Sequence, residues 1–328
     1  MTPSELSWTV LSTVRRAVGA GELQVTVPDR VVVQRPPRPG CGDYATNVAL
    51  QLAGQAGRSA FDVARVLAVR LAKEPGIAQV EVAEAGFLNI TLSARAYADV
   101  VRQVIEQGAD YGRGDGLADE PATVVPEPPH GVRAATVAEV VNRLLAAAGA
   151  PAGPPERLSA AEPAEDPEKL LGRDAARWAL LRPPAEDTPR PTAALLAQRE
   201  ANPLFRVRYA RSRTRALLRN AHDLGVRVDG AAGDPYRHPA ETELLGLIAD
   251  FPRVVETAAR RRAPDRLARH LERLADAYLR FQDECPALPK GDEKPSAVHA
   301  ARVRLADATG IVLADGLHLL GISAPDHL

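Results

Sequence analysis

The sequence predicts two unlike domains, a small α+β domain at the N-terminal end and an all-helical bundle at the C-terminal end. Three observations support this prediction. Residues 1–116 mix helical periodicity with short valine-rich stretches that alternate as strands do. Residues 166–328 show helical periodicity throughout, as expected of a bundle. A proline-rich stretch, 117–165, separates the two and is expected to be a linker.

Composition limits the classes of protein to which this chain can belong. Its 328 residues carry a formal net charge of −1, so the chain as a whole is not a polycation. Charges interrupt the apolar runs, which argues against a membrane span, and no basic-then-apolar secretory signal is visible. Cys41 and Cys285 lie far apart and form neither a disulfide framework nor a metal-spaced pair. We therefore expect a cytoplasmic protein with no metal site, no cofactor and no membrane contact.

The first domain alternates between helical and strand patterns. Ser59 is placed as the N-cap of one helix, with Asp62 at the capping-box position. A turn at Ala85-Gly86 separates two strands, and Gly108 ends the last helix. The expected elements are a helix at 6–18, one or two strands within 25–36, helices at 45–52 and 59–71, strands on both sides of 85–86, and a helix at 93–107.

The stretch between the domains is predicted to hold one strand, one helix and a loop. The strand contains Val124 and Val125 and ends at prolines, which lack an N–H donor. Apolar positions at helical spacing follow His130-Gly131, and Gly149 ends that helix. Residues 151–166 are expected to form a loop. Strand, tight loop and helix is the unit from which nucleotide-binding α/β folds are built, but here it does not continue into such a fold.

The second domain has only helical patterns. Asp166-Pro167 starts its first helix, because proline is favoured in the first turn. A long amphipathic stretch is interrupted only at Asn202-Pro203. The first helix is expected to start at residue 167. Further helical segments are expected at 172–183, 192–220, 240–249, 252–261, 265–281 and 297–320.

Three ordered motifs in the first domain resemble the N-terminal additional domain of arginyl-tRNA synthetases: GDYATNVALQLA at 42–53, GFLNITLS at 86–93 and GADYGRGD at 108–115. The resemblance implies a domain that grips the outer corner of tRNA, with Phe87 stacking on an unpaired base and Asn89 bonding its edge. Residues i and i+2 of a strand share a face, so this geometry is feasible. In the alternative interpretation, Phe87 is a core residue, and the Asn89 side chain satisfies the hydrogen bonding of a turn.

The second domain resembles the anticodon-binding domain of the same family. Asp174-Ala175-Ala176-Arg177 matches its Asp-Ala-Leu-Arg motif with one change, and NPLFRVRYARSRTRALLRNA at 202–221 matches its Tyr-Ala-x-x-Arg helix. The resemblance implies that Tyr209 meets the anticodon loop, as do the aromatic residues near Tyr278 and Phe281. Independently, Arg208, Arg211 and Arg215 share one side of the helix, where they could bind phosphates. The alternative is a solvated arginine face that pairs with Asp and Glu.

The class I catalytic domain that the family carries between these two domains is expected to be absent. A doubly wound sheet needs on the order of 100–200 residues, and about fifty are available. Pro128-Pro129-His130-Gly131 lacks the spacing of the His-x-Gly-His signature, and Arg157 to Ala161 lacks the lysines of the second signature. His130 has no partner at a meaningful spacing, so no catalytic residue is predicted.

These features support a functional hypothesis: a catalytically inactive arginyl-tRNA synthetase paralogue, similar to the actinobacterial anticodon-binding proteins related to that enzyme. It would not be an enzyme and would bind tRNA, in particular tRNA-Arg, in a regulatory or accessory role. Two alternatives stayed open. One is a protein-interaction scaffold or dimer. In the family, one face of the helical bundle packs on the catalytic domain, and without that domain another surface must bury this face. The other is a residual arginine–tRNA ligase.

Overall fold

A computed structural model of residues 1–328 describes the whole chain except residues 37–39, 130, 229–235 and 328. The chain divides into two compact units, residues 1–100 and residues 101–328. The expected boundaries at 116 and 165 stay a prediction. His130, for which no catalytic role is predicted, lies outside the described residues.

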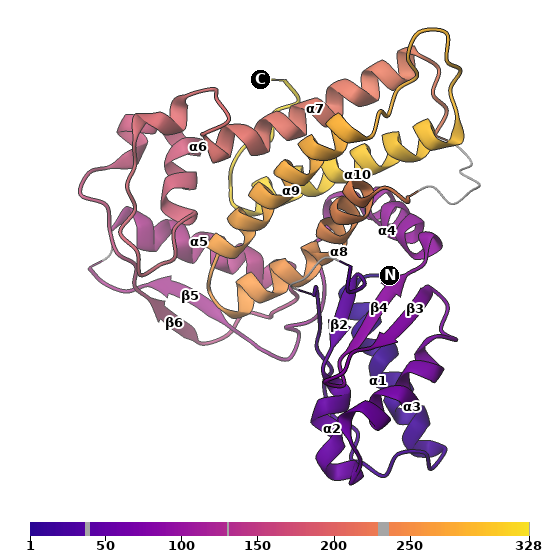
Figure 1. Ribbon diagram of the computed structural model, residues 1–328. Helices are drawn as coiled ribbons and strands as arrows, with labels where there is room; N and C mark the ends of the chain where they lie inside the picture. Colours follow the sequence, from indigo (N-terminus) through magenta and orange to yellow (C-terminus); the bar gives the residue numbers. More distant parts are fainter. Residues whose placement is uncertain (37–39, 130, 229–235, 328) are drawn as a thin grey trace. The chain divides into compact units, whose positions relative to one another are not determined.

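The first unit is an antiparallel sheet with helices packed against it (Figure 1). The strand order is β1-β2-β4-β3. At its centre, Ile90 of β4 lies opposite Tyr44 of β2 and Val80 of β3. The elements of this unit are α1 (Pro3–Gly19), β1 (Val33–Gln34), β2 (Tyr44–Thr46), α2 (Val48–Ala56), α3 (Ala60–Leu71), β3 (Ile77–Val82), β4 (Leu88–Leu92) and the beginning of α4 (Ala94–Gln107).

Local sequence signals explain most of these boundaries. The Ser59 hydroxyl accepts from the Asp62 backbone N–H at 3.1 Å, which confirms the predicted cap of α3. Gly86 has a φ of +89°, which the turn between β3 and β4 requires and which glycine adopts without strain. The expected helix at 45–52 was wrong at its start. Tyr44–Thr46 is the strand β2, held between β1 and β4, so tertiary pairing overrides the helical pattern there.

The second unit is a helical bundle with a two-stranded parallel sheet beside it (Figure 1). Within the bundle α8 packs on α9, and α7 packs on both α9 and α10. After the end of α4, its elements are the 3-10 helix η1 (Gly108–Asp110), β5 (Thr123–Pro126), α5 (Val132–Ala147), β6 (Pro155–Leu158), α6 (Pro167–Leu181), the 3-10 helix η2 (Ala193–Leu196), α7 (Pro203–Asp223), α8 (Pro239–Arg260), α9 (Asp265–Glu284) and α10 (Ala297–Leu319).

Three expectations about this unit were wrong. The first part of the helix expected at 192–220 is not helical apart from the 3-10 helix η2, because α7 begins only at Pro203. Residues 151–166 are not only loop, because Pro155–Leu158 forms β6 and pairs in parallel with β5. The two helices expected at 240–249 and 252–261 are one helix, α8, with Pro252 inside it. Buried Phe251 and Val255 on either side of Pro252 anchor α8 in the core, so packing outweighs the hydrogen bond that proline removes.

Candidate nucleic-acid interface

Helix α7 carries half of the predicted RNA-binding residues, namely Arg208, Tyr209, Arg211 and Arg215. Its start is fixed by Asn202, whose Oδ1 accepts from the backbone N–H of Leu204 at 3.1 Å and of Phe205 at 3.3 Å. Leu204, Val207, Ala210, Thr214, Leu217 and Ala221 form its buried face. The arginines and Tyr209 occupy the other positions. The helical period therefore directs the basic side chains away from the core.

Arg208 is held by two groups of this same chain. It pairs with Asp174, and its Nη2 donates to the Ser323 hydroxyl at 2.7 Å. Burial pushes the pKa of Asp174 up, but the hydrogen bond from Ser323 and the charge of Arg208 outweigh it, so this pKa lies below its ordinary value. Asp174 is therefore a carboxylate at neutral pH, and the aspartate of the Asp-Ala-Ala-Arg motif positions the Arg208 guanidinium.

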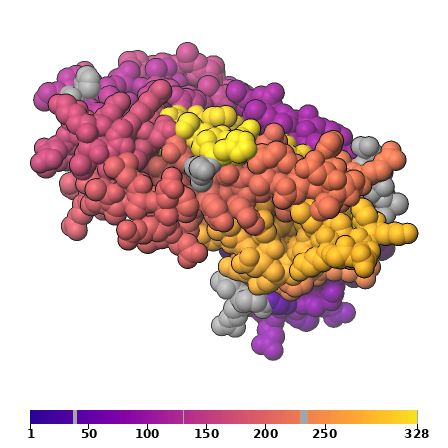
Figure 2. Space-filling model, turned by 90° about the horizontal axis from the view of Figure 1, so that it is seen from above, coloured from indigo at the N-terminus to yellow at the C-terminus, as the bar shows by residue number. Residues whose placement is uncertain are grey.

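Arg211 and Arg215 share a second carboxylate. Oδ1 of Asp326 lies 3.0 Å from Nη2 of Arg211 and 3.4 Å from Nε of Arg215. The Ser212 hydroxyl also donates to the Asp326 carbonyl at 3.4 Å. Figure 2 shows the C-terminal residues, in yellow, lying against the salmon-coloured surface of α7. The three arginines thus pair with carboxylates, as expected for an arginine face that pairs with Asp and Glu. The same geometry also suits a phosphate.

Tyr209 is the most accessible aromatic residue of this helix face. Its side chain is 38% exposed. The ring stacks on Phe205, with centroids 5.6 Å apart and planes 17° apart, and the guanidinium of Arg213 lies 6.0 Å from its centroid. A ring that is fixed by a neighbour on one side and flanked by a cation is a suitable platform for a base.

The structure places Tyr278 and Phe281 elsewhere than the resemblance implied. Both are fully buried on α9, with their ring centroids 6.1 Å apart. Neither ring has a face open to a base, so both act here as core residues. The spacing contains a signal for this placement, because they continue the heptad of Leu267, Leu271 and Leu274.

In the first unit, Phe87 and Asn89 lie at the start of β4. Leu88 and Ile90 point into the core, so the alternate residues face the other side of the sheet. Phe87 is 37% exposed and Asn89 is half-buried. This geometry leaves the Phe87 ring available for stacking, and its contact with RNA stays a prediction.

Sequence reasoning missed the buried Arg133. Its side chain is fully buried at the start of α5 and its guanidinium donates only to backbone carbonyls. These carbonyls belong to Ala161, Leu180, Pro183, Pro184, Ala185 and Asp187. No local pattern marks this role, because the acceptors are 28–54 residues away along the chain.

The N-terminus of α5 is occupied by a carboxylate from the same chain. Glu162 accepts from the backbone N–H of Arg133 at 2.9 Å and of Ala134 at 2.8 Å. A Cβ at Gly131 would lie 2.3 Å from the Glu162 carboxyl carbon, so only glycine leaves room for this contact. The first-turn donors that favour an anion at a helix start are thus filled by Glu162.

The part of the chain that the structure describes holds neither a metal-binding cluster nor a membrane-spanning helix. No group of three or more His, Cys, Asp or Glu side chains is arranged to hold a metal ion there. Within the same residues, no helix combines the length and apolarity needed to cross a membrane.

Comparisons with known proteins give matches in both units. Residues 9–92 match the model of the "Arginyl tRNA synthetase N terminal domain", and residues 207–328 match that of the "DALR anticodon binding domain". A protein of Frankia alni named "Arginine--tRNA ligase" is 27% identical in an alignment of 552 positions that covers all of both chains. One of the same name from Clavibacter sepedonicus is 42% identical over 165 residues, half of this chain and 30% of that protein.

Solved structures agree on the fold. The arginyl-tRNA synthetase of Thermus thermophilus superposes with a TM-score of 0.65 over all of both chains at 14% identity. That of Plasmodium falciparum has a TM-score of 0.72 over 99% of both chains at 8% identity. At such identities the likeness shows the fold alone.

The comparisons contradict two expectations. An inactive paralogue and a protein that is not an enzyme were expected. The two relatives are instead named as ligases, and one of them aligns over the full length of both chains. The reasoning from the length of the linker and from the missing signatures was therefore insufficient to exclude ligase function.

Proposed function

Because the chain belongs to the arginyl-tRNA synthetase family, we propose that it binds tRNA through α7 and takes part in arginine–tRNA ligation. The family itself implies tRNA binding, and relatives from Frankia alni and Clavibacter sepedonicus are consistent with the expected actinobacterial type. We propose tRNA-Arg as the tRNA, because it is the substrate that the relatives' name indicates. A cytoplasmic location follows from the same proposal, since tRNA is used there.

The exposed ring of Tyr209 carries this proposal. Stacking on Phe205 holds the ring, the guanidinium of Arg213 lies over it, and 38% of Tyr209 is exposed. A base from an unpaired loop can stack on it, and neighbouring guanidiniums can bind the adjacent phosphates. Arg208, Arg211 and Arg215 would exchange their carboxylate partners for phosphates on binding.

Replacing Tyr209 tests the proposal. We expect Tyr209→Ala to weaken binding of a tRNA-Arg transcript by about 1–3 kcal/mol, roughly 5- to 150-fold in Kd. Tyr209→Phe is the matched control, because it keeps the ring and the stack on Phe205, and its affinity should stay close to that of the unaltered protein. Filter binding at several salt concentrations measures both. Equal binding by all three proteins, or no preference for tRNA over random RNA, would count against the proposal.

We further infer that the described residues hold no doubly wound catalytic sheet. Two observations support this inference. The parallel sheet in this part of the chain consists of β5 and β6, and the start of α5 is filled by Glu162. Arginine-dependent ATP–pyrophosphate exchange by the whole chain measures directly whether it activates arginine. A homodimer or a protein partner also stays a prediction, which light scattering tests.

A further inference from the structure

We propose that the groove along α3 is a docking site for an acidic segment of another protein, a short amphipathic helix that carries carboxylates beside apolar side chains. The groove belongs to the first unit and lies outside the residues that the sequence motifs identified. The proposal is independent of RNA binding by α7, which belongs to the other unit.

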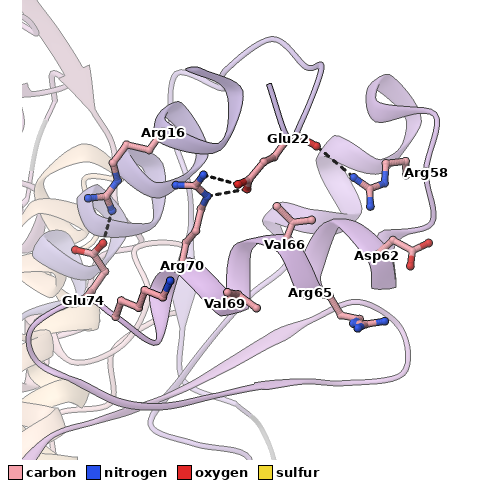
Figure 3. A pocket seen from close by; sticks show the side chains of 10 residues that line it. Arg16, Glu22, Arg58, Asp62, Arg65, Val66, Val69, Arg70 and Glu74 are labelled. Carbon is pink, nitrogen blue, oxygen red and sulfur yellow. Dashed lines mark hydrogen bonds and ion pairs between the residues drawn. The ribbon is translucent and has the colours of Figure 1, made fainter. Parts of the chain in front are cut away.

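The groove is the hollow shown in Figure 3, with a volume of about 700 Å³. Helix α3 contributes two valines to its lining, Val66, which is half-buried, and Val69, which is 63% exposed. The two are three residues apart and therefore lie on one face of the helix. In Figure 3 they lie between Arg65 and Arg70. The lining also holds five cations and three carboxylates, those of Arg16, Arg58, Arg65, Arg70 and Lys73, and of Glu22, Asp62 and Glu74.

The three carboxylates of the groove already have partners within the chain. Glu22 accepts two hydrogen bonds from Arg70, at 2.7 and 2.8 Å, and Glu74 pairs with Arg16. The hydrogen bond from Arg70 holds the pKa of Glu22 below its ordinary value, so Glu22 stays ionised. Asp62 accepts from a serine hydroxyl at the start of α3. These contacts hold two of the five cations in place and leave the other three without a carboxylate.

Arg58, Arg65 and Lys73 form this unpaired set. In the part of the chain that the structure describes, none of the three forms an ion pair. Arg58 donates to the Glu22 carbonyl at 3.2 Å, which neutralises no charge. The three lie two residues before α3, near its middle and two residues after it. Because α3 has 12 residues and extends about 18 Å, one small anion cannot reach all three cations.

An elongated ligand with separated negative charges fits this arrangement. A helix of three to four turns is about as long as α3, so its glutamates can reach cations at both ends of the groove. Its apolar side chains can cover Val66 and Val69, which lie between Arg65 and Lys73 in the sequence. An amphipathic helix laid in a groove is a common mode of peptide recognition, and complementary charges give it specificity.

A nucleic-acid strand suits the groove less well than such a helix does. Its phosphates form an unbroken row of negative charge, which the three carboxylates of the lining would repel. None of the ten described residues of the lining is aromatic, so bases would find no ring there on which to stack. A peptide, by contrast, can place carboxylates opposite the unpaired cations and apolar side chains opposite the valines.

A labelled model peptide tests the proposal. The probe is a helix of about 14 residues made of Glu, Ala and Leu, with leucines at i, i+4 spacing on one face and glutamates on both sides of that face. Fluorescence anisotropy measures its binding to the whole chain. We expect a Kd on the order of micromolar, because the surface is small. Two control peptides, one with Gln for Glu and one with Ser for Leu, should each bind roughly fivefold more weakly or worse.

Variants of the groove show where the peptide binds. Arg58→Gln, Arg65→Gln and Lys73→Gln together should weaken binding roughly tenfold or more, and Val69→Ser alone about threefold or more. Arg15→Gln is the matched control, because Arg15 is an exposed arginine of α1 that does not line the groove. Its Kd should stay near that of the unaltered chain. Circular dichroism checks that the variants are folded.

Four outcomes would overturn the proposal. The first is no saturable binding of the peptide below about 1 mM. The second is an equal loss in Arg15→Gln and in the triple variant, which would indicate a general charge effect. The third is a triple variant that loses affinity for a tRNA-Arg transcript but keeps its affinity for the peptide, which would assign the groove to RNA. The fourth is self-association of the unaltered chain, measured by light scattering, that the triple variant abolishes, which would assign the groove to a second copy. RNA binding by α7 is tested separately by Tyr209→Ala.

Discussion

At the residue scale, burial turns single polar side chains into determinants of stability. Arg133 is fully enclosed, and every hydrogen bond that its guanidinium makes links α5 to the segments around α6. Burial lowers the pKa of Arg133, and the charge of Glu162 opposes that shift. Removing this side chain would leave several buried carbonyls without donors, which costs more than the hydrogen bonds themselves contribute.

We predict that Arg133→Met lowers the free energy of unfolding by about 3–5 kcal/mol, because methionine fills part of the volume and donates nothing. Urea denaturation followed by circular dichroism measures the change. Arg157→Met is the control, since Arg157 is an exposed arginine of β6, and its effect should be within about 0.5 kcal/mol. Similar stabilities of the two variants would contradict the role assigned to Arg133.

Asp315 gives the stability of the second unit a pH dependence. Burial raises the pKa of this carboxyl to about 6, although Arg113 and the Gly112 backbone N–H favour the charged form. The folded protein therefore binds this proton more tightly than the unfolded chain does. The resulting stabilisation is complete below the ordinary pKa of 3.8 and is lost as the pH rises through about 6.

We predict that Asp315→Asn, which stays neutral, gains stability relative to the unaltered protein as the pH rises from 4.5 to 7.5. The gain should be at most about 3 kcal/mol, the equivalent of a shift of about two pKa units. Urea denaturation at the two pH values measures it. Asp283→Asn is the control, because Asp283 is exposed, and its effect should be the same at both pH values. A gain that is independent of pH would contradict the assignment.

At the element scale, the segment after α10 decides how available the arginines of α7 are. Asp326 presents one carboxylate to Arg211 and Arg215, where a backbone phosphate of RNA would also be attracted. If α7 binds RNA as proposed, the segment and the RNA strand would compete for the same guanidiniums. Asp326 and Arg215 are half-exposed, so water and salt weaken their pair, and an RNA with many phosphates can displace the Asp326 carboxylate.

We predict that Asp326→Asn strengthens binding of a tRNA-Arg transcript and makes its salt slope steeper by about 1, because two guanidiniums lose their internal partner. Filter binding over a salt series measures both quantities. Asp283→Asn changes the net charge equally at an exposed position of α9 and should have little effect. Identical behaviour of the two variants would indicate a general charge effect and no competition at α7.

At the scale of the whole molecule, a net charge of −1 conceals local basic surfaces in both units. If Tyr209 and Phe87 both contact one tRNA, their contributions to the binding free energy add, because the altered residues share no partners. We predict that Tyr209→Ala combined with Phe87→Ala loses the sum of the two separate losses in binding free energy, within about 0.5 kcal/mol. A combined loss no greater than the larger single loss would show that the two residues do not act on the same tRNA.

Much of the fold was predictable because it depends on local signals. The cap at Ser59, the turn at Gly86 and the end of α4 at Gly108 follow from backbone preferences of single residues. The long helices α9 and α10 follow from repeating apolar positions. Strand β2 and the pairing of β5 with β6 were missed, since both depend on partners distant in sequence.

The candidate site also combines features set by local sequence with features set by distant segments. The sequence by itself determined that Tyr209 and the arginines lie on the outer face of α7, because the helical period fixes which positions avoid the core. Only the tertiary structure decided that Tyr278 and Phe281 are buried and that Asp326 reaches Arg211. The physical reason is that side-chain direction is a local property, whereas burial and charge pairing are set by segments that only folding brings together.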